Sequence, residues 1–195
     1  MVLVELDEKR LIAEAANGDV SAFEHLYRMH VGRVYGLCIR LVDSQTEAED
    51  CTQETFIKAW QRLGQFRGGS VLATWLHRIA FNEVMGRKRR YASEARHLSV
   101  VGASERVTAV ESTTVDELEQ AITRLPDRAR QVFVLKRIYG YTHEETAQML
   151  NIAVGTCKAQ LYRASKLLAT ALSKQSAIPA SASDDASDQH QISSE

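Results

Sequence analysis

Apolar residues recur every three or four positions over two long stretches of this chain, and a stretch without that spacing separates them. The first stretch runs from Glu8 to about Arg90, and the second runs from Val115 to about Ser173. A period near 3.6 residues is typical of helices that bury one face. Only two prolines occur among the 195 residues, so long segments can remain helical. The spacing predicts an all-α protein with two helical domains joined by a flexible linker.

The predicted domains cover residues 8–91 and 115–173. The linker, 92–114, is rich in Ser, Thr, Val and small residues, and the tail, 174–195, is dominated by Ser, Ala and Asp. Such a tail buries too little apolar surface to offset the entropy of ordering it, so we expect disorder there. Helix breaks in the first domain are expected at residues 17–19, 43–44 and 66–70.

Composition excludes several classes of protein. The net charge of −1 says little about nucleic acids, because their binding needs a local basic surface and not a basic protein. No segment approaches the ~18 apolar residues of a membrane span, and the start lacks the pattern of a signal peptide. We therefore expect a cytoplasmic protein that does not insert into membranes.

The sequence offers no pattern for catalysis or metal binding. His143 and Glu144 begin like the zinc-protease motif HExxH, but Ala147 stands where the second histidine belongs. There is no phosphate-binding glycine loop and no nucleophile beside a base, so we expect no enzyme, no catalytic residue, no metal and no cofactor. Three well-separated cysteines occupy apolar helical positions and are expected to be buried reduced thiols: Cys38, Cys51 and Cys157.

The second domain has the pattern of a helix-turn-helix. A helix opens at Pro126 and stops at Gly140, and Thr142 with Glu145 then has the spacing of a capping box for a short helix. A tight connection at residues 151–153 leads into a third helix. Its predicted buried stripe consists of Val154, Cys157, Leu161, Ala164 and Leu168.

The opposite face of that third helix carries polar, basic and aromatic side chains. A helix with Lys and Arg that follows a short helix and a tight turn is typical of one that enters the DNA major groove. There cations contact phosphates or guanine, and a ring or methyl group contacts thymine. An ordinary three-helix bundle with a solvated basic face is the alternative. The DNA-binding candidates are Thr156, Lys158, Ala159, Tyr162 and Arg163.

In the first domain, the predicted helix 46–63 has an acidic side. Glu47, Asp50 and Glu54 recur at helical spacing there and form a patch of four carboxylates with Glu49, and Lys58 is the first basic residue after them. Acidic residues in a first turn favour the helix dipole, which is one explanation. Like charges so spaced repel by roughly a few tenths of a kcal/mol, and a basic protein partner is the other explanation.

The sign of the charge reverses downstream. Residues 76–97 hold six Lys or Arg against two Glu, and Phe66, Trp75, Phe81 and Tyr91 lie in or near this segment. Cations interleaved with aromatic rings are typical of sites that hold single-stranded DNA, where stacking contributes ~1–3 kcal/mol per base. Trp75 is also interpretable as a core residue, and residues 87–90 as a solvated helix end.

Six motifs in order resemble the extracytoplasmic-function (ECF) sigma factors of the sigma-70 family, over roughly residues 8 to 172. In the first domain, besides Ala22-Phe23, they are EAEDCTQETF at 47–56, FRGGS at 66–70 and TWLHRIAFN at 74–82. In the second domain they are LPDR at 125–128, YGYT at 139–142 and VGTCK at 154–158. The resemblance implies a region 2-like helical bundle and a region 4-like helix-turn-helix. It also implies a subunit that binds core RNA polymerase and directs promoter-specific initiation.

The resemblance also implies roles for individual residues. Glu47, Asp50, Gln53 and Glu54 match the contact with the coiled-coil clamp of the polymerase largest subunit. The third helix of the second domain matches the reader of the −35 element. Flipping a base costs a few kcal/mol, which a preformed pocket offsets. Candidates for binding the melted −10 element are Arg62, Phe66, Arg67, Arg78, Ile79, Asn82, Arg87 and Lys88.

The expected partners are core RNA polymerase, promoter DNA and an anti-sigma factor that holds the two domains together. We expect the free protein to be a monomer. A stand-alone helix-turn-helix regulator is the alternative, and it would need a dimer to span two half-sites. Four positions depart from the family pattern and leave the promoter sequence open: Gly69 for Asp or Glu, Cys157 for Val, Ala159 for Ser and Gln160 for Arg.

Overall fold

The structure, a computed structural model, describes residues 2–68, 70–97 and 114–175. These residues form helices and turns without a strand, which confirms the all-α prediction. The first domain contains α1 (Val2–Ala16), α2 (Val20–Leu41), α3 (Gln45–Arg62), the 3-10 turn η1 (Leu63–Gln65) and α4 (Leu72–His97). The second contains α5 (Thr114–Thr123), α6 (Asp127–Phe133), the π-helical segment η2 (Val134–Ile138), α7 (His143–Leu150) and α8 (Val154–Gln175).

Side-chain caps and a glycine mark the helix breaks in the first domain. Asp19 caps α2 by accepting a hydrogen bond from the backbone N–H of Ala22 at 3.0 Å, and Ser44 caps α3 in the same way for Glu47 at 3.2 Å. Gly18 precedes the first cap with a φ of +96°, a conformation that glycine adopts without strain. The predicted breaks at residues 17–19 and 43–44 are therefore confirmed.

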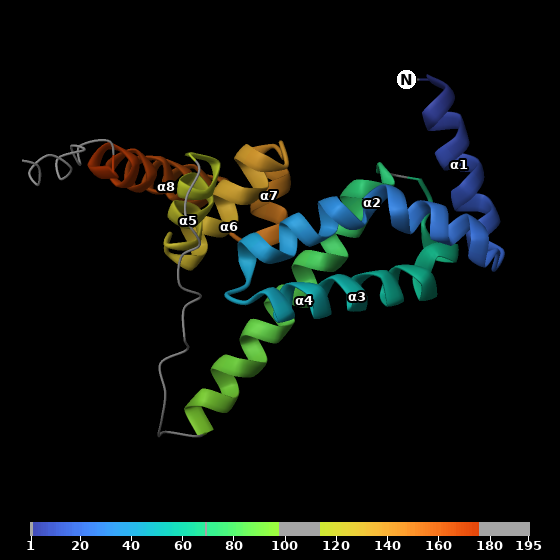
Figure 1. Ribbon diagram of the computed structural model, residues 1–195, viewed down its shortest axis with the longest axis horizontal. Helices are drawn as coiled ribbons and strands as arrows, with labels where there is room; N and C mark the ends of the chain where they lie inside the picture. Colours follow the sequence, from blue (N-terminus) through green and yellow to red (C-terminus); the bar gives the residue numbers. More distant parts are fainter. Residues whose placement is uncertain (1, 69, 98–113, 176–195) are drawn as a thin grey trace, which may run out of the picture.

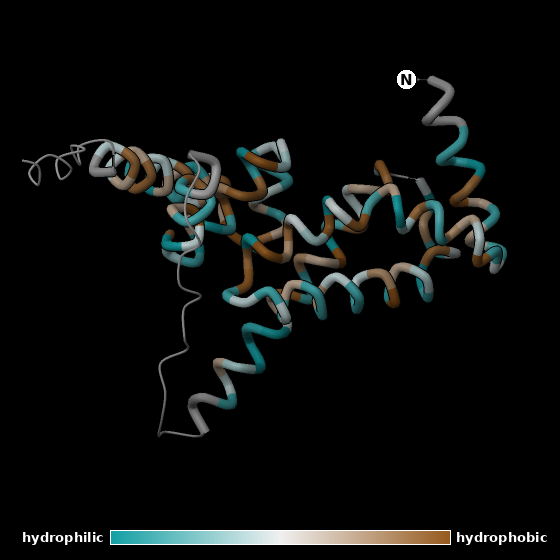
Figure 2. The backbone as a smooth tube through the Cα atoms, viewed as in Figure 1, coloured by the Kyte–Doolittle hydropathy of each residue, from teal (hydrophilic) through white to brown (hydrophobic). Residues whose placement is uncertain are grey.

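The core of the first domain forms around α2. This helix packs against α1, α3 and α4. Figure 2 shows that the apolar residues lie mainly along the parts of the helices inside the bundle, while the coloured part of α4 that projects from the bundle is mostly hydrophilic. Cys38 and Cys51 lie in this core, Cys157 lies in the second domain, and all three are buried free thiols as predicted. The buried residues of α2 are Ala22, Leu26, His30, Val34, Leu37, Cys38 and Leu41.

The second domain is the predicted helix-turn-helix. Thr142 and Glu145 form a complete capping box at the start of α7, and Asn151 ends that helix with a left-handed φ of 50°. Pro126 occupies the N-cap position of α6, one residue before the first turn in which we expected it. The stripe on α8 is buried at Cys157, Leu161, Ala164 and Leu168, whereas Val154 is half-buried.

The two domains lie against one another. α5 and α6 contact α2, and Figure 1 shows them beside the C-terminal end of that helix. α4 continues to His97, so the first residues of the predicted linker are helical because Ala, Glu and Arg favour helix even without an apolar stripe. The rest of the predicted linker, from residue 98 to 113, and the predicted tail from residue 176 onward lie outside the described residues.

Candidate surfaces for partner and nucleic-acid binding

The acidic side of α3 faces solvent over most of its length. Gln53 and Glu54 are exposed, and Glu47 is half-buried beside the helix cap. Asp50 is half-exposed and accepts a hydrogen bond from Arg87 of α4 at 2.9 Å. Sequence reasoning gave Asp50 and Arg87 separate partners, a polymerase and DNA, but in the structure they bind each other.

This ion pair leaves an acidic surface available. Burial is the largest single influence on Arg87 and lowers the pKa of the guanidinium, but its hydrogen bond to Asp50 and the negative charges around it together outweigh burial and raise that pKa. Within the described part of the chain, Glu47 and Glu54 form no ion pair. The carboxylates are therefore not all neutralised by the protein's own arginines, and Glu54 in particular is free to meet a basic partner.

The predicted −10 residues lie at the end of α3, in the loop after η1 and along α4. Arg62, Arg67, Arg78 and Asn82 are exposed. Phe66 is half-buried, with its ring centroid 5.3 Å from that of Trp75, which itself packs against the core. Trp75 therefore packs against both Phe66 and the core, in keeping with its interpretation as a core residue.

Three −10 candidates have less free surface than the sequence indicated. Ile79 is 8% exposed and belongs to the core, so its side chain has little surface to offer a base. Arg87 is tied to Asp50 as described above. Lys88 forms an ion pair with Asp127 of the second domain at 3.1 Å.

The predicted −35 face is open. Cys157 and Leu161 fix one side of α8 in the core, and the opposite side is exposed. Tyr162 is 72% exposed, a fraction that gives a ring no packing role within the fold. Lys158 and Arg163 form no ion pair within the described residues, so this face presents unneutralised positive charge. The exposed candidates are Thr156, Lys158, Ala159, Tyr162 and Arg163.

Sequence reasoning missed a cluster of aromatic residues between α2 and α3. Phe23 contacts Phe56 and Trp60 edge to face, and Tyr27 contacts Phe56 with ring centroids 4.7 Å apart. Tyr27 and Trp60 remain more than a third exposed, and the neighbouring Ile57 is half-exposed. The available sequence signal was the spacing of four residues between the two aromatic residues on each helix, which places both on one face.

A second omission is Arg130 of α6. Its side chain is 3% exposed and lies between Asp127 of its own helix and Asp43 of the first domain. The sequence signal for its burial was its position between two inward-facing residues, since Ala129 and Val132 are both fully buried. An unpaired cation in such a place is costly, so its partners were predictable in kind but not in identity.

The described residues combine surfaces of opposite charge with a helix-turn-helix. A helix-turn-helix with an open basic face shares the molecule with a bundle that has an acidic side and a basic, aromatic end. In the described residues no cluster of three or more His, Cys, Asp or Glu side chains is arranged to hold a metal. None of their helices has both the length and the apolar character needed to cross a bilayer. These features define a two-domain DNA-binding protein with a further surface for a protein partner.

Comparisons with known proteins agree with this description. The family profile of Sigma-70 region 2 matches residues 26–94, and that of Sigma-70, region 4 matches residues 116–168. The chain is 32% identical over 186 residues to the RNA polymerase sigma-H factor of Pseudomonas aeruginosa, covering 88% of this chain and 96% of that protein. It is 31% identical over 180 residues to the ECF RNA polymerase sigma factor SigW of Bacillus subtilis, covering 85% and 96%.

Two solved structures share the fold. One is the sigma factor RpoE in complex with the anti-sigma factor NepR from Bartonella quintana, with a TM-score of 0.67, 26% identity and coverage of 79% of this chain and 98% of that one. The other is CnrH in complex with the cytosolic domain of CnrY, with a TM-score of 0.60, 25% identity and coverage of 86% and 98%.

The chain belongs to the sigma-70 family of RNA polymerase sigma factors, within its ECF group. It has both the region 2 and the region 4 domains, so the function is promoter-specific transcription initiation, and the stand-alone regulator is not favoured.

Proposed function

We propose that three surfaces of this sigma factor divide the work of initiation. The acidic side of α3 binds core RNA polymerase through Glu47, Asp50, Gln53 and Glu54. The basic, aromatic surface of η1 and α4 holds the melted −10 element, and the exposed face of α8 reads the −35 element. The observation that carries this proposal is the placement of free charge of opposite sign on separate surfaces of one molecule.

Polymerase binding is assigned to α3 because the described residues do not neutralise all of its carboxylates. Glu54 is exposed and unpaired, and Asp50 keeps half of its surface while Arg87 fixes its orientation. A basic surface on the partner removes the repulsion among these carboxylates and gains charge-assisted hydrogen bonds. Gln53 adds a neutral donor and acceptor beside them.

Holding of opened DNA is assigned to the loop before α4. Phe66 is half-buried, with its ring tilted against that of Trp75, and Arg67 and Asn82 are exposed. Stacking of a flipped base on the ring contributes ~1–3 kcal/mol. That gain is similar in size to the few kcal/mol that unstacking costs, so hydrogen bonds from Asn82 and the arginine charges decide the balance.

Reading of the −35 element is assigned to α8. The capped helix α7 and the left-handed turn at Asn151 set its angle, as in other helix-turn-helix proteins. Lys158 and Arg163 contact phosphates or guanine edges, and Tyr162 and the Ala159 methyl group supply apolar contact. The chain acts in the cytoplasm with polymerase, has no catalytic step of its own, and is held inactive by an anti-sigma factor.

A charge reversal with a matched control tests the polymerase assignment. Glu54→Lys places a cation on the acidic side of α3, while Glu144→Lys makes the same change at an exposed glutamate of α7, in the other domain. Glu144 is assigned to none of the three proposed surfaces. We expect Glu54→Lys to lose core polymerase in a co-purification assay and Glu144→Lys to retain it, with both variants folded by circular dichroism.

The opposite result is equally informative. If both variants co-purify with polymerase as the unmodified chain does, α3 is not the docking surface. In vitro transcription with Arg163→Ala then tests α8 separately, with an expected loss of about 1–3 kcal/mol in promoter affinity. An unchanged promoter profile removes Arg163 from the −35 site.

A further inference from the structure

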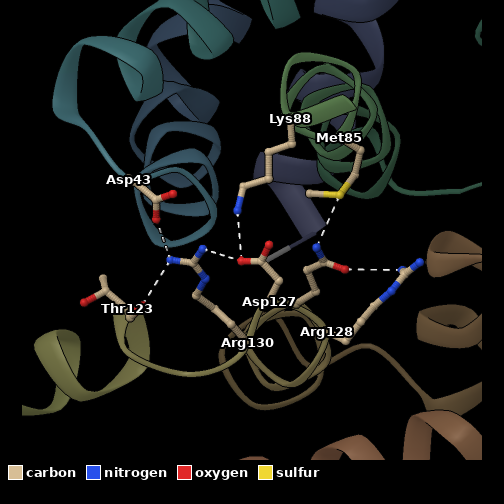
Figure 3. A network of polar contacts seen from close by, with 8 residues as sticks. Asp43, Met85, Lys88, Thr123, Asp127, Arg128 and Arg130 are labelled. Atoms are coloured by element: carbon tan, nitrogen blue, oxygen red, sulfur yellow. Dashed lines mark hydrogen bonds and ion pairs between the residues drawn. The ribbon is translucent and has the colours of Figure 1, made fainter. Parts of the chain in front are cut away.

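Arg130 and its partners form a contact between the two domains in which the charges match. Arg130 of α6 donates to Asp43 of the first domain at 3.1 Å and to Asp127 of its own helix at 2.8 Å. Lys88 of α4 forms an ion pair with the same Asp127 at 3.1 Å, as Figure 3 shows. Two cations thus meet two carboxylates, and this network has no unmatched charge to offer an outside ligand.

A cleft at another place between the domains lacks such matching. It has a volume of about 440 Å³ and is lined by α2, by residues 71–77 at the start of α4 and by residues 138–141 of the second domain. Two arginines, a histidine and two tyrosines line it, and none of the described residues in its walls is Asp or Glu. Walls that carry cations and no carboxylate favour a negatively charged occupant.

Arg33 supplies the free charge of this cleft. It is exposed and forms no ion pair within the described residues. Burial and, after it, the charge of Arg33 lower the pKa of His77, so the guanidinium lies near this ring. Arg40, by contrast, is already bound to Glu119 of α5, with Nε 3.0 Å from Oε2. An anion in the cleft therefore has Arg33 as its ion-pair partner.

His77 brings an unsatisfied polar atom to the cleft. The residue is 5% exposed, and its Nδ1 is 2.8 Å from the Tyr141 hydroxyl. Its Nε2 is buried and has no hydrogen-bond partner within the described residues. Folded proteins rarely leave such an atom unpaired. In either neutral tautomer of the ring, Nε2 remains available to a polar group of a ligand.

A glycine and two apolar side chains determine what else fits. Gly32 of α2 lines the cleft, and a Cβ there would meet nothing within 4 Å, so the backbone of the helix is accessible. Val71 and Ile138 also line the cleft and are 65% and 38% exposed. Apolar side chains in water gain from a ligand that covers them, so the occupant should have an apolar body.

The wall from the second domain follows an uncommon helical turn. In η2 the N–H of Tyr139 donates to the carbonyl of Val134, five residues back, at 3.2 Å. π-helical segments are rare and are frequent at functional sites. The Tyr139 hydroxyl donates to the Arg33 carbonyl at 2.8 Å, and its ring lies edge to face with that of His77 at 4.7 Å. The end of η2 is therefore fixed beside the free charge, with aromatic rings around it.

We propose that this cleft binds a small organic anion, a carboxylate with an aromatic body. Arg33 pairs with the carboxylate, the His77 ring supplies a hydrogen bond, and the aromatic body covers Val71 and Ile138 and packs against the tyrosine rings. The cleft contains none of the residues assigned to polymerase or DNA, so the proposal is independent of those assignments. A ligand that binds the folded chain here stabilises it by mass action.

A charged probe and its neutral counterpart test the site. Naphthylacetate carries the carboxylate, and naphthylacetamide has nearly the same shape without the charge. We expect naphthylacetate to shift the resonances of the Gly32 amide and the His77 ring in proton–nitrogen correlation NMR of the full chain. The shifts should saturate with a Kd of about 1 mM or below, as for ligands of this size. The amide should bind about twofold to fivefold more weakly, the effect of one exposed ion pair.

Two variants with matched controls locate the probe. Gly32→Leu fills the cleft and should abolish the shifts at His77, whereas Gly86→Leu should keep them. Gly86 lies in α4 outside the cleft, and a Cβ there also meets nothing within 4 Å. Arg33→Gln should weaken naphthylacetate about twofold to fivefold and make the acid and the amide bind alike. Arg28→Gln removes an exposed cation of the same helix outside the cleft and should change neither affinity.

Three results overturn the proposal. They are an absence of saturable shifts in the unmodified chain, equal affinity of that chain for acid and amide, and shifts in Gly32→Leu as large as in the unmodified chain. Circular dichroism checks that each variant folds. Arg33→Gln changes only an exposed side chain, so it decides the question even where Gly32→Leu fails to fold.

Discussion

Acidification should lower the free energy of unfolding of this protein through one buried histidine. His77 is 5% exposed, its Nδ1 is 2.8 Å from the Tyr141 hydroxyl, and its ring lies edge to face with Tyr139 at 4.7 Å. Burial lowers the pKa of His77 from 6.5 to about 4, and the positive charges of Arg33 and His30 act in the same direction. The neutral ring is therefore the form that fits this site.

The direction of the effect follows from proton binding. The unfolded chain takes up the His77 proton below pH 6.5, whereas the folded chain resists it until about pH 4. The stabilisation is complete above pH 6.5 and is lost as the pH falls toward 4. Since one pKa unit corresponds to about 1.36 kcal/mol, the free energy of unfolding should fall by about 2 kcal/mol near pH 5 through this group alone.

Urea unfolding at neutral pH and near pH 5 measures this loss. His77→Asn keeps a polar atom near Tyr141 but removes the titration, so its stability should fall by about 2 kcal/mol less than that of the unmodified chain. Carboxylates titrate in both proteins and cancel in the comparison. His25→Asn, at an exposed position, should behave like the unmodified chain. If all three proteins lose the same free energy on acidification, His77 is not held neutral and the reasoning is wrong.

Three further outcomes are expected. Leu37→Ala removes a side chain with no exposure and should cost about 2–5 kcal/mol in urea unfolding at neutral pH. Thr142→Ala removes half of the α7 capping box and should cost about 1 kcal/mol, measurable as a lower Tm in calorimetry. Tyr162→Ala should leave the free energy of unfolding within about 0.5 kcal/mol, because the ring is 72% exposed, yet weaken binding of −35 duplex DNA in a fluorescence anisotropy assay with core polymerase.

Features that depend on a few neighbouring residues were predictable from the sequence. The caps at Asp19 and Ser44 and the capping box of Thr142 act within three positions, so residue identity and spacing determine them. The buried stripe on α8 follows in the same way, since one helix period decides which side chains share a face. The exposed −35 candidates follow from that stripe.

Features that depend on distant pairs were not predictable. Arg130 meets Asp43 across 87 positions, and Tyr139 meets the Arg33 carbonyl across 106. From the sequence, Gly36 is only a residue that weakens a helix, and its position beside Tyr139 is visible only in the structure. Asp50 and Arg87, 37 positions apart, likewise seemed to serve different partners. Periodicity identifies which face of a helix is buried, but not which partner covers it.

The three buried thiols have a practical and a biological consequence. Burial raises the pKa of Cys38 to about 12 and also raises those of Cys51 and Cys157, so oxidants and alkylating reagents meet unreactive sulfur in the native chain. Oxidation of these thiols therefore requires the native chain to open first. The rate at which each native cysteine is alkylated therefore measures how often the protein opens locally. Cys38 and Cys51 report opening between α2 and α3, and Cys157 reports opening on the buried side of α8.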